Sequence, residues 1–76
     1  MREEILDMLA DICEDDIVKE DLNVDLFETG LLDSLGFVEL MVEVEERFGI
    51  PISPTEVERE EVSTPEKVIV FIEGKK

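Results

Sequence analysis

The sequence predicts an all-α domain, a small bundle of four helices with a long loop between the first helix and the second. Apolar residues recur at intervals of three and four in three segments, as on one face of a helix. A stretch without this period separates the first two segments. Residues that typically begin or end helices stand at the boundaries of the periodic segments. Because the chain has 76 residues, we expect one domain over residues 1–76, without room for a deep enclosed active site.

The first helix is expected over about residues 2–13, where the apolar side chains follow the helical period. These side chains are Ile5, Met8, Leu9 and Ile12. Residues 14–33 have no sustained period and are rich in aspartate, so we expect an ordered loop. Apolar residues should anchor this loop to the helices, and they are Val18, Leu22, Val24, Leu26 and Phe27. Loops of this length are often functional.

The second helix is expected over about residues 35–48. Gly49 suits the left-handed position that follows a helix, and Pro51 lies just beyond it. Residues 50–54 are then predicted to form a turn, and residues 55–61 a short third helix. The middle of the chain therefore reads as one long helix, a turn and one short helix.

The last helix has strong start signals. Thr64 is expected to cap its N-terminus, Pro65 suits the first helical position, and Glu66 is favoured by the positive end of the helix. The side facing the core should contain Val68, Ile69 and Ile72, with Phe71 beside them. Lys75 and Lys76 suit the negative C-terminal end.

The second predicted helix has apolar residues on two sides. One side should face the core, with Phe37, Leu40, Met41, Val44 and Phe48. The other side carries a second apolar strip of Leu35, Val38 and Val42, flanked by the carboxylates of Glu39, Glu43 and Glu46. Since a surface helix needs only one apolar side, we interpret this strip as a docking surface for a partner with a basic rim. Alternatively, Leu35 and Val38 pack against the long loop.

The charge of the chain limits its partners. Seven basic and 22 acidic residues give a net charge of −15, which disfavours binding to nucleic acid and to anionic membranes. No apolar run is long enough to span a bilayer, and no signal peptide is evident, so we expect a cytoplasmic protein without membrane insertion, acting as a monomer. The single cysteine, Cys13, cannot form an internal disulfide, which agrees with a reducing compartment.

Catalytic and metal-binding functions have weak support. The chain has no histidine, and Cys13 has no evident base nearby, so we do not expect an enzyme. Asp21, Asn23 and Asp25 match the start of a calcium-binding EF-hand loop, but the glycine and the bidentate glutamate that this loop requires are both replaced by leucine. No metal site is expected, although an acidic interaction module without cofactor remains an alternative.

A short motif, Gly30-Leu31-Leu32-Asp33-Ser34-Leu35-Gly36, stands where the long loop enters the second helix. Unpaired backbone N–H groups at a helix N-terminus stabilise a phosphate, so a phosphodiester on Ser34 would be favoured there. Alternatively, Asp33 or Ser34 is only a helix cap. A reciprocal capping box is absent, because the third residues after these two are Gly36 and Phe37 rather than Glu or Gln.

Together with the chain length, the acidic loop and the helix pattern, this motif resembles the acyl carrier protein family. The resemblance covers nearly the whole chain and implies a four-helix bundle of that type. It also implies that Ser34 carries a 4′-phosphopantetheine arm ending in a thiol, attached from coenzyme A by a phosphopantetheinyl transferase. In this interpretation Asp33 and Leu35 belong to the attachment site, and Asp33 helps to present Ser34.

Within that family the chain most resembles the D-alanyl carrier proteins. The matching residues are Gly36, Glu56, Arg59, Thr64 and Pro65. Three positions depart from the family pattern, with Val57 in place of Phe, Glu58 in place of Asp and Val62 in place of Trp. The resemblance implies a D-alanine-activating ligase that loads the thiol, and a membrane O-acyltransferase that receives D-alanine for teichoic acids. A carrier for fatty acid, polyketide or non-ribosomal peptide synthesis is the alternative.

Overall fold

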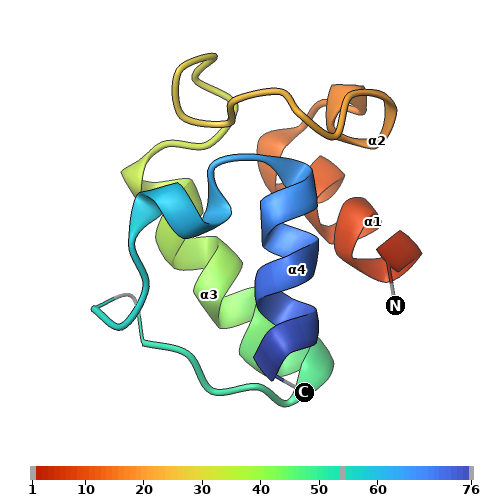
Figure 1. Ribbon diagram of the computed structural model, residues 1–76. Coiled ribbons are helices and arrows are strands. Elements are labelled where there is room, and N and C mark those ends of the chain that lie inside the picture. Colours follow the sequence, from red (N-terminus) through yellow and green to blue (C-terminus); the bar gives the residue numbers. More distant parts are fainter. Residues whose placement is uncertain (1, 54, 76) are drawn as a thin grey trace.

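The computed structural model describes residues 2–53 and 55–75. Its three longer helices are α1 (Arg2–Cys13), α3 (Ser34–Phe48) and α4 (Pro65–Lys75). Two short elements complete the bundle, the one-turn helix α2 (Ile17–Glu20) and the 3-10 helix η1 (Arg59–Val62). No strand occurs in the described part of the chain, so the predicted all-α bundle is confirmed (Figure 1).

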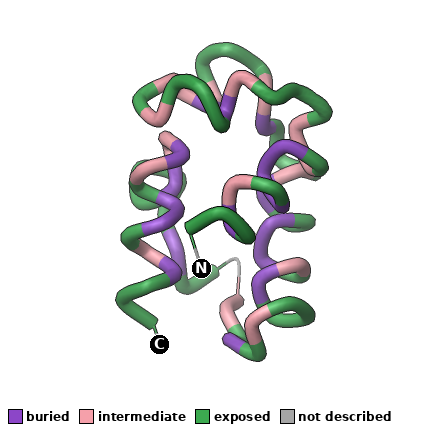
Figure 2. The backbone as a smooth tube through the Cα atoms, turned by 90° about the vertical axis from the view of Figure 1, so that its right-hand side faces the viewer, coloured by how far each residue is buried: buried purple, intermediate pink, exposed green. Residues whose placement is uncertain are grey.

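The helices enclose one apolar core. α1 packs against α2, α3 and α4, whereas η1 packs against α4. α3 and α4 begin at the same end of the bundle, and the loop that leads into α3 crosses this end (Figure 1). Buried residues gather on the sides of the helices that face one another (Figure 2). No polar or charged residue is buried in residues 2–53 and 55–75, so the interior of the described chain is entirely apolar.

The predicted side of α3 forms much of this core. Phe37, Leu40, Met41 and Val44 are buried, as expected. Phe48, the last residue of α3, is half-buried and packs against this core, so it lies at the edge of the predicted stripe.

The ends of the long helices follow the sequence signals closely. Gly49 has a φ of +68°, and its N–H donates to the carbonyl of Glu45 at 2.9 Å, as predicted for a residue that ends a helix. Thr64 Oγ1 accepts a hydrogen bond from the N–H of Lys67 at 3.1 Å, which confirms its capping role. α3 begins at Ser34, one residue earlier than expected. Pro54, in the predicted turn, and Lys76 lie outside the described residues.

The loop between α1 and α3 differs from the prediction because it contains α2. This single helical turn is too short to produce a recognisable period in the sequence. It is stabilised by tertiary packing of the buried Val18 and by Asp15, whose Oδ1 accepts a hydrogen bond from the N–H of Ile17 at 3.0 Å. The predicted anchoring is otherwise confirmed, since Leu26 is buried and the remaining anchors are half-buried.

Backbone hydrogen bonds fasten this loop to the start of α4. The N–H of Leu26 donates to the carbonyl of Ser63 at 2.7 Å, and the N–H of Glu66 donates to the carbonyl of Leu22 at 3.1 Å. Within the loop, the N–H of Leu32 donates to the carbonyl of Leu26 at 2.8 Å. The approach of the chain to Ser34 is therefore defined by bonds to a distant part of the sequence.

The short third helix was predicted at the wrong place. Residues 55–56 form a turn, and helical structure begins only at Arg59, as a 3-10 helix. Val57 and Val62 are both buried. They are five positions apart, so in a regular α-helix their side chains would point about 140° apart and could not both face the core. Ending the turn before Arg59 allows both side chains to reach the core. The position of η1 therefore depends on tertiary packing, which the local sequence pattern does not show.

Candidate functional site

The predicted attachment residue lies at an exposed corner of the bundle. Ser34 is exposed and is the first residue of α3, directly after the loop that crosses the bundle end. The preceding residue, Asp33, is the helix cap, since its Oδ1 accepts a hydrogen bond from the N–H of Gly36 at 2.8 Å. This settles which of the two candidates caps α3, and it leaves the Ser34 hydroxyl free of that task.

Gly36 allows the chain to pack closely behind Ser34. A Cβ at this position would lie 2.9 Å from Cδ1 of Leu32, a distance shorter than real Cβ contacts. The Leu32 side chain is fully buried and has little room to move aside. The same Cβ would lie 3.4 Å from the Asp33 carboxylate oxygen that caps the helix. Packing therefore explains why a glycine follows Asp-Ser-Leu, because Leu32 fills the space that a side chain at position 36 would need.

A cation touches the Ser34 hydroxyl. Nη2 of Arg59, on η1, donates a hydrogen bond to Ser34 Oγ at 2.8 Å. The Arg59 guanidinium lies over the ring of Phe27, 5.4 Å from the ring centroid. Phe27 in turn packs against Phe37, with ring centroids 6.2 Å apart. From the sequence, Arg59 is only a match to a family pattern, and its contact with Ser34 is not apparent. The sequence offered one signal for it, an isolated arginine among glutamates.

The surroundings of Ser34 fit the phosphodiester that the resemblance implies. The hydroxyl is exposed, the positive end of a 15-residue helix begins at this residue, and a guanidinium is within hydrogen-bond distance. The carboxylate of Asp33 is a nearby negative charge, but its Oδ1 is bound to a backbone N–H of α3. Ser34 and Arg59 could therefore hold the group, Ser34 through its oxygen and Arg59 through its charge.

The second apolar strip of α3 faces solvent. Leu35 is 70% exposed, Val38 43% and Val42 47%. The alternative that Leu35 packs against the loop is wrong, because most of its surface is accessible. Val38 and Val42 line a surface hollow between α3 and α1, to which α1 contributes Asp11 and Ile12. The strip therefore continues onto a second helix, which the helical wheel of α3 alone could not reveal.

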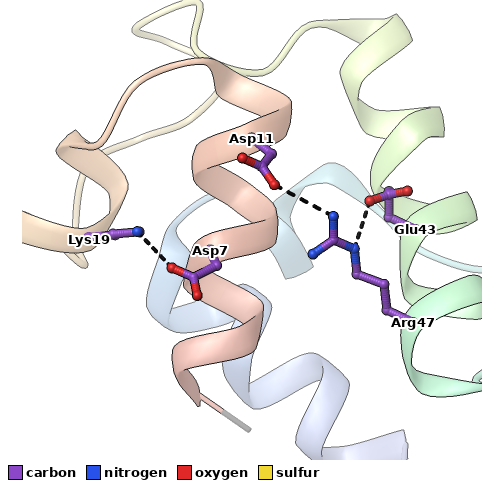
Figure 3. Close-up of polar contacts among 5 residues, drawn as sticks. All are labelled: Asp7, Asp11, Lys19, Glu43 and Arg47. Atoms are coloured by element: carbon purple, nitrogen blue, oxygen red, sulfur yellow. Dashed lines mark hydrogen bonds and ion pairs between the residues drawn. The ribbon is translucent and has the colours of Figure 1, made fainter.

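The three carboxylates beside this strip have different surroundings. Glu39 and Glu46 are exposed, whereas Glu43 is half-buried. Arg47 Nε donates to Glu43 Oε2 at 2.8 Å, and Arg47 Nη2 lies 3.5 Å from Asp11 Oδ2 on α1 (Figure 3). Glu43 is therefore part of an ion-pair link between α3 and α1. The spacing of four residues between Glu43 and Arg47 is the spacing at which a glutamate and an arginine pair on a helix.

Cys13 and the aspartates of the long loop were the other residues with potential chemistry, and their surroundings indicate structural roles. Burial, followed by the nearby negative charge of Asp15, raises the pKa of the Cys13 thiol to about 11. Asp21 Oδ1 accepts a hydrogen bond from the N–H of Asn23, and Asp25 Oδ1 accepts from two backbone N–H groups that follow it. The acids of the loop therefore stabilise local turns. Within the described ranges, no group of three potential ligands is placed to hold a metal ion.

No helix in residues 2–53 and 55–75 is long and apolar enough to cross a membrane.

Comparison with known proteins agrees with this geometry. The family described as phosphopantetheine attachment site matches residues 3–72. The D-alanyl carrier protein of Abiotrophia defectiva is 50% identical over 72 residues, which cover 95% of this chain and 91% of that protein. The D-alanyl carrier proteins of Bacillus velezensis and Bacillus subtilis are 48% and 47% identical over 68 residues, covering 90% of this chain and 87% of each relative. The chain therefore belongs to the D-alanyl carrier protein family, as a carrier with a phosphopantetheine prosthetic group rather than an enzyme.

Proposed function

We propose that Ser34 is the attachment site of 4′-phosphopantetheine and that the attached arm carries D-alanine as a thioester in the cytoplasm. The observation that carries this proposal is the exposed Ser34 hydroxyl at the start of α3, in a chain of this family. A carrier depends on partner enzymes. Here they are a phosphopantetheinyl transferase, a D-alanine-activating ligase and a membrane O-acyltransferase that uses D-alanine for teichoic acids.

Ser34 and the two residues beside it are proposed to have different roles in the attachment site. Ser34 supplies the oxygen that becomes part of the phosphodiester. Asp33 caps the helix and so holds the hydroxyl at its exposed corner, and Leu35, the next residue, offers an apolar contact to the transferase. When bound, the prosthetic group supplies the thiol on which an acyl group is carried. Cys13 is a poor substitute for that thiol, because burial raises its pKa to about 11 and leaves it with less thiolate at neutral pH than an ordinary cysteine has.

The partner enzymes are proposed to dock on the outer face of α3. We define this face by Leu35, Val38 and Val42, with Glu39, Glu43 and Glu46 beside them. An apolar centre with an acidic border suits a partner that has an apolar patch inside a basic border. The hollow shared with Ile12 of α1 extends this face toward a second helix. Docking that depends on these charges should weaken with added salt.

The cargo is proposed to remain outside the helical core. The amine of a D-alanyl thioester is protonated at neutral pH if its pKa is that of an ordinary α-amino group. Burying this charge without a partner would be strongly unfavourable, and the described interior contains no polar residue to pair with it. Leu40 and Val44 are fully buried, so a fatty acyl chain that entered the core would have to displace packed side chains. The ammonium group is instead expected in solvent near the acidic surface.

The attachment site can be tested by mass. The apo protein is incubated with coenzyme A and a transferase, and its intact mass and modified peptide are measured. Wild type should gain one phosphopantetheine on Ser34, and Ser34→Ala should gain none. Ser63→Ala is the matched control, since Ser63 is a second described serine before a helix and should not affect modification. An adduct on Ser34→Ala would reject the assignment.

The cargo needs a separate test. The holo protein is offered to a D-alanine ligase with ATP and, in parallel, to a fatty acyl synthetase. D-alanine should load preferentially, and the chemical shifts of Leu40 and Val44 should remain those of the holo form. Preferential fatty loading with large shifts at both residues would reject the D-alanine cargo and leave the carrier function intact.

A further inference from the structure

Arg59 is unusual among the cations of this acidic chain because its guanidinium contacts a neutral hydroxyl. It lies among Glu56, Glu58, Glu60 and Glu61 in the sequence. Arg2, Lys19 and Arg47 each pair with a carboxylate in the described part of the chain. Arg59 instead reaches 25 residues back along the sequence to donate to Ser34 Oγ at 2.8 Å. An arginine with carboxylates on neighbouring residues is thus directed to the hydroxyl at the start of α3.

The position of Arg59 is supported by aromatic packing. Its guanidinium lies over the ring of Phe27, and Phe27 packs against the buried Phe37 of α3. Stacking on an aromatic face is a favourable arrangement for arginine, which holds the planar group in one orientation. The loop, η1 and the first turn of α3 therefore meet at this one side chain. Arg59 is exposed, and its contacts with Phe27 and Ser34 favour one orientation of the guanidinium, beside the hydroxyl.

A neutral hydroxyl accepts a hydrogen bond from a guanidinium but does not neutralise its charge or engage both of its parallel N–H donors. Hydrogen bonds from arginine to an anion are roughly twice as strong as bonds between neutral groups, and the planar fork suits two oxygens of one phosphate. A phosphodiester at Ser34 would also add about one negative charge beside Asp33, in a chain whose net charge is already −15. A cation at this position would offset that repulsion.

We propose that Arg59 is a positioning residue for the prosthetic group. In the apo protein it orients the Ser34 hydroxyl, and in the holo protein its guanidinium pairs with the phosphodiester oxygens. The proposal rests on Ser34 being the attachment site. As a consequence, attachment of the group strengthens the link between η1 and the start of α3.

A purely structural role would give a different result. If Arg59 only joins Phe27, η1 and α3 by packing, its removal should destabilise apo and holo protein to the same degree. If it pairs with the phosphodiester, its removal should destabilise the holo protein more. The difference between the two losses isolates the interaction, as in a double-mutant cycle.

The experiment compares wild type, Arg59→Gln and Arg47→Gln in apo and holo forms. Urea unfolding gives the unfolding equilibrium constant, and the ³¹P resonance of the holo protein reports on the phosphodiester. In the holo form, Arg59→Gln should raise this constant by about two- to fivefold more than in the apo form, the range of exposed ion pairs. It should also move the ³¹P resonance. Arg47→Gln, the matched control, removes an ion-paired arginine of α3 and should affect both forms equally without moving that resonance.

Two further measurements cover the case in which Arg59→Gln does not fold. Arg59→Lys keeps the charge but loses the fork, and its ³¹P resonance should fall between those of wild type and free phosphopantetheine. In wild type, the Arg59 Nε–H resonance should shift when apo protein becomes holo, while that of Arg47 should stay in place.

The two proposals fail in distinguishable ways. Equal destabilisation of apo and holo Arg59→Gln, or an Arg59 Nε–H resonance unchanged by attachment, would overturn the role of Arg59 even if the mass shows complete modification of Ser34. A wild-type protein that gains no mass on Ser34 would overturn the attachment site itself, and the role of Arg59 with it.

Discussion

The inner face of α3 and the apolar strip on its outer face both consist of hydrophobic side chains, yet the bundle buries only the inner face. Leu40, Met41 and Val44 on the inner face have almost no accessible surface, whereas Val38 and Val42 on the outer face remain about half exposed. The two sets alternate along one continuous helix and consist of hydrophobic residues in both cases. The difference lies in what the bundle places against them.

This contrast separates the two tasks of the helix. Burial of the inner face contributes to folding, because each side chain is removed from water. The apolar strip of the outer face contributes less to folding because much of it stays in water, and we infer that it serves contact with partners. Ser34 stands at the start of both faces, so a prosthetic group attached there would lie close to the proposed docking surface.

Leu40→Ala should destabilise the protein by about 2–5 kcal/mol, because it leaves a cavity in a packed core. Val42→Ala is the matched change on the outer face and should cost less than about 0.5 kcal/mol. Urea unfolding of both variants measures the difference. Comparable losses at the two positions would mean that the outer face also contributes to packing.

Val38→Asp and Glu39→Lys should each slow loading by the ligase by about tenfold, since they disturb the apolar centre and the acidic border of the docking surface. Their stability should remain within about 0.5 kcal/mol of wild type. The initial rate of D-alanine loading is the measurement. Glu73→Lys, an exposed change on α4, is the control for charge alone. Loading at the wild-type rate by both outer-face variants would show that partners dock elsewhere.

Glu43→Lys is a poorer test of docking. Glu43 is paired with Arg47, and its replacement by a cation would disturb the link between α3 and α1. A slower loading rate in this variant would combine a docking effect with a structural one. Glu39 borders the same hollow and is exposed, so it reports on docking more directly.

Cys13 should not compete chemically with the thiol of the arm, although it lines a polar hollow next to Leu35. Its pKa of about 11 reduces the thiolate at pH 8 relative to an ordinary cysteine. After allowing for the higher nucleophilicity of a more basic thiolate, we expect iodoacetamide to alkylate native Cys13 about tenfold more slowly than the urea-unfolded protein.

The alkylation rate of Cys13 should continue to rise from pH 9 toward pH 11. Because folding raises this pKa from 9.0, the folded state favours the protonated thiol. Its contribution to stability is complete below pH 9 and is lost as the pH rises through about 11. Equal rates for native and unfolded protein at pH 8 would contradict the burial of this thiol.

Asp33→Ala should cost about 1 kcal/mol, because it removes the cap of α3 at the point where both faces begin. Asp33→Asn keeps an oxygen that can accept from Gly36 N–H and should remain close to wild type in stability. The free energy of unfolding of both variants tests the cap. The rate of modification by the transferase, measured on the folded Asn variant, then shows whether the charge itself is needed. An equal loss of stability in both variants would argue against a capping role.

Local signals in the sequence were sufficient for the long helices and for the position of Ser34. The helical period in residues 2–13, the glycine after Phe48 and the Thr64-Pro65 pair each act within one or two turns of chain. Such short-range signals were read correctly to within one residue. The same reasoning separated the two faces of α3, because the angle between side chains on a helix depends only on their spacing.

The elements that were missed depend on contacts between distant residues. α2 is a single turn held by the burial of Val18, and η1 begins where Val57 and Val62 can both reach the core. Neither is long enough to show a period. The solvent exposure of Leu35 could not be predicted from the helical period either, because that period does not show whether the long loop covers the side chain.

The helical class, the core side of α3, the serine at its start and the family resemblance can all be inferred from the order of residues along the chain. The contact of Arg59 with Ser34, the ion pair from Arg47 to α1 and the packing of Leu32 against Gly36 become apparent only in the folded bundle. The first group follows from spacing along one segment of chain. The second requires side chains from separate segments to meet, and their meeting is a property of the packed bundle.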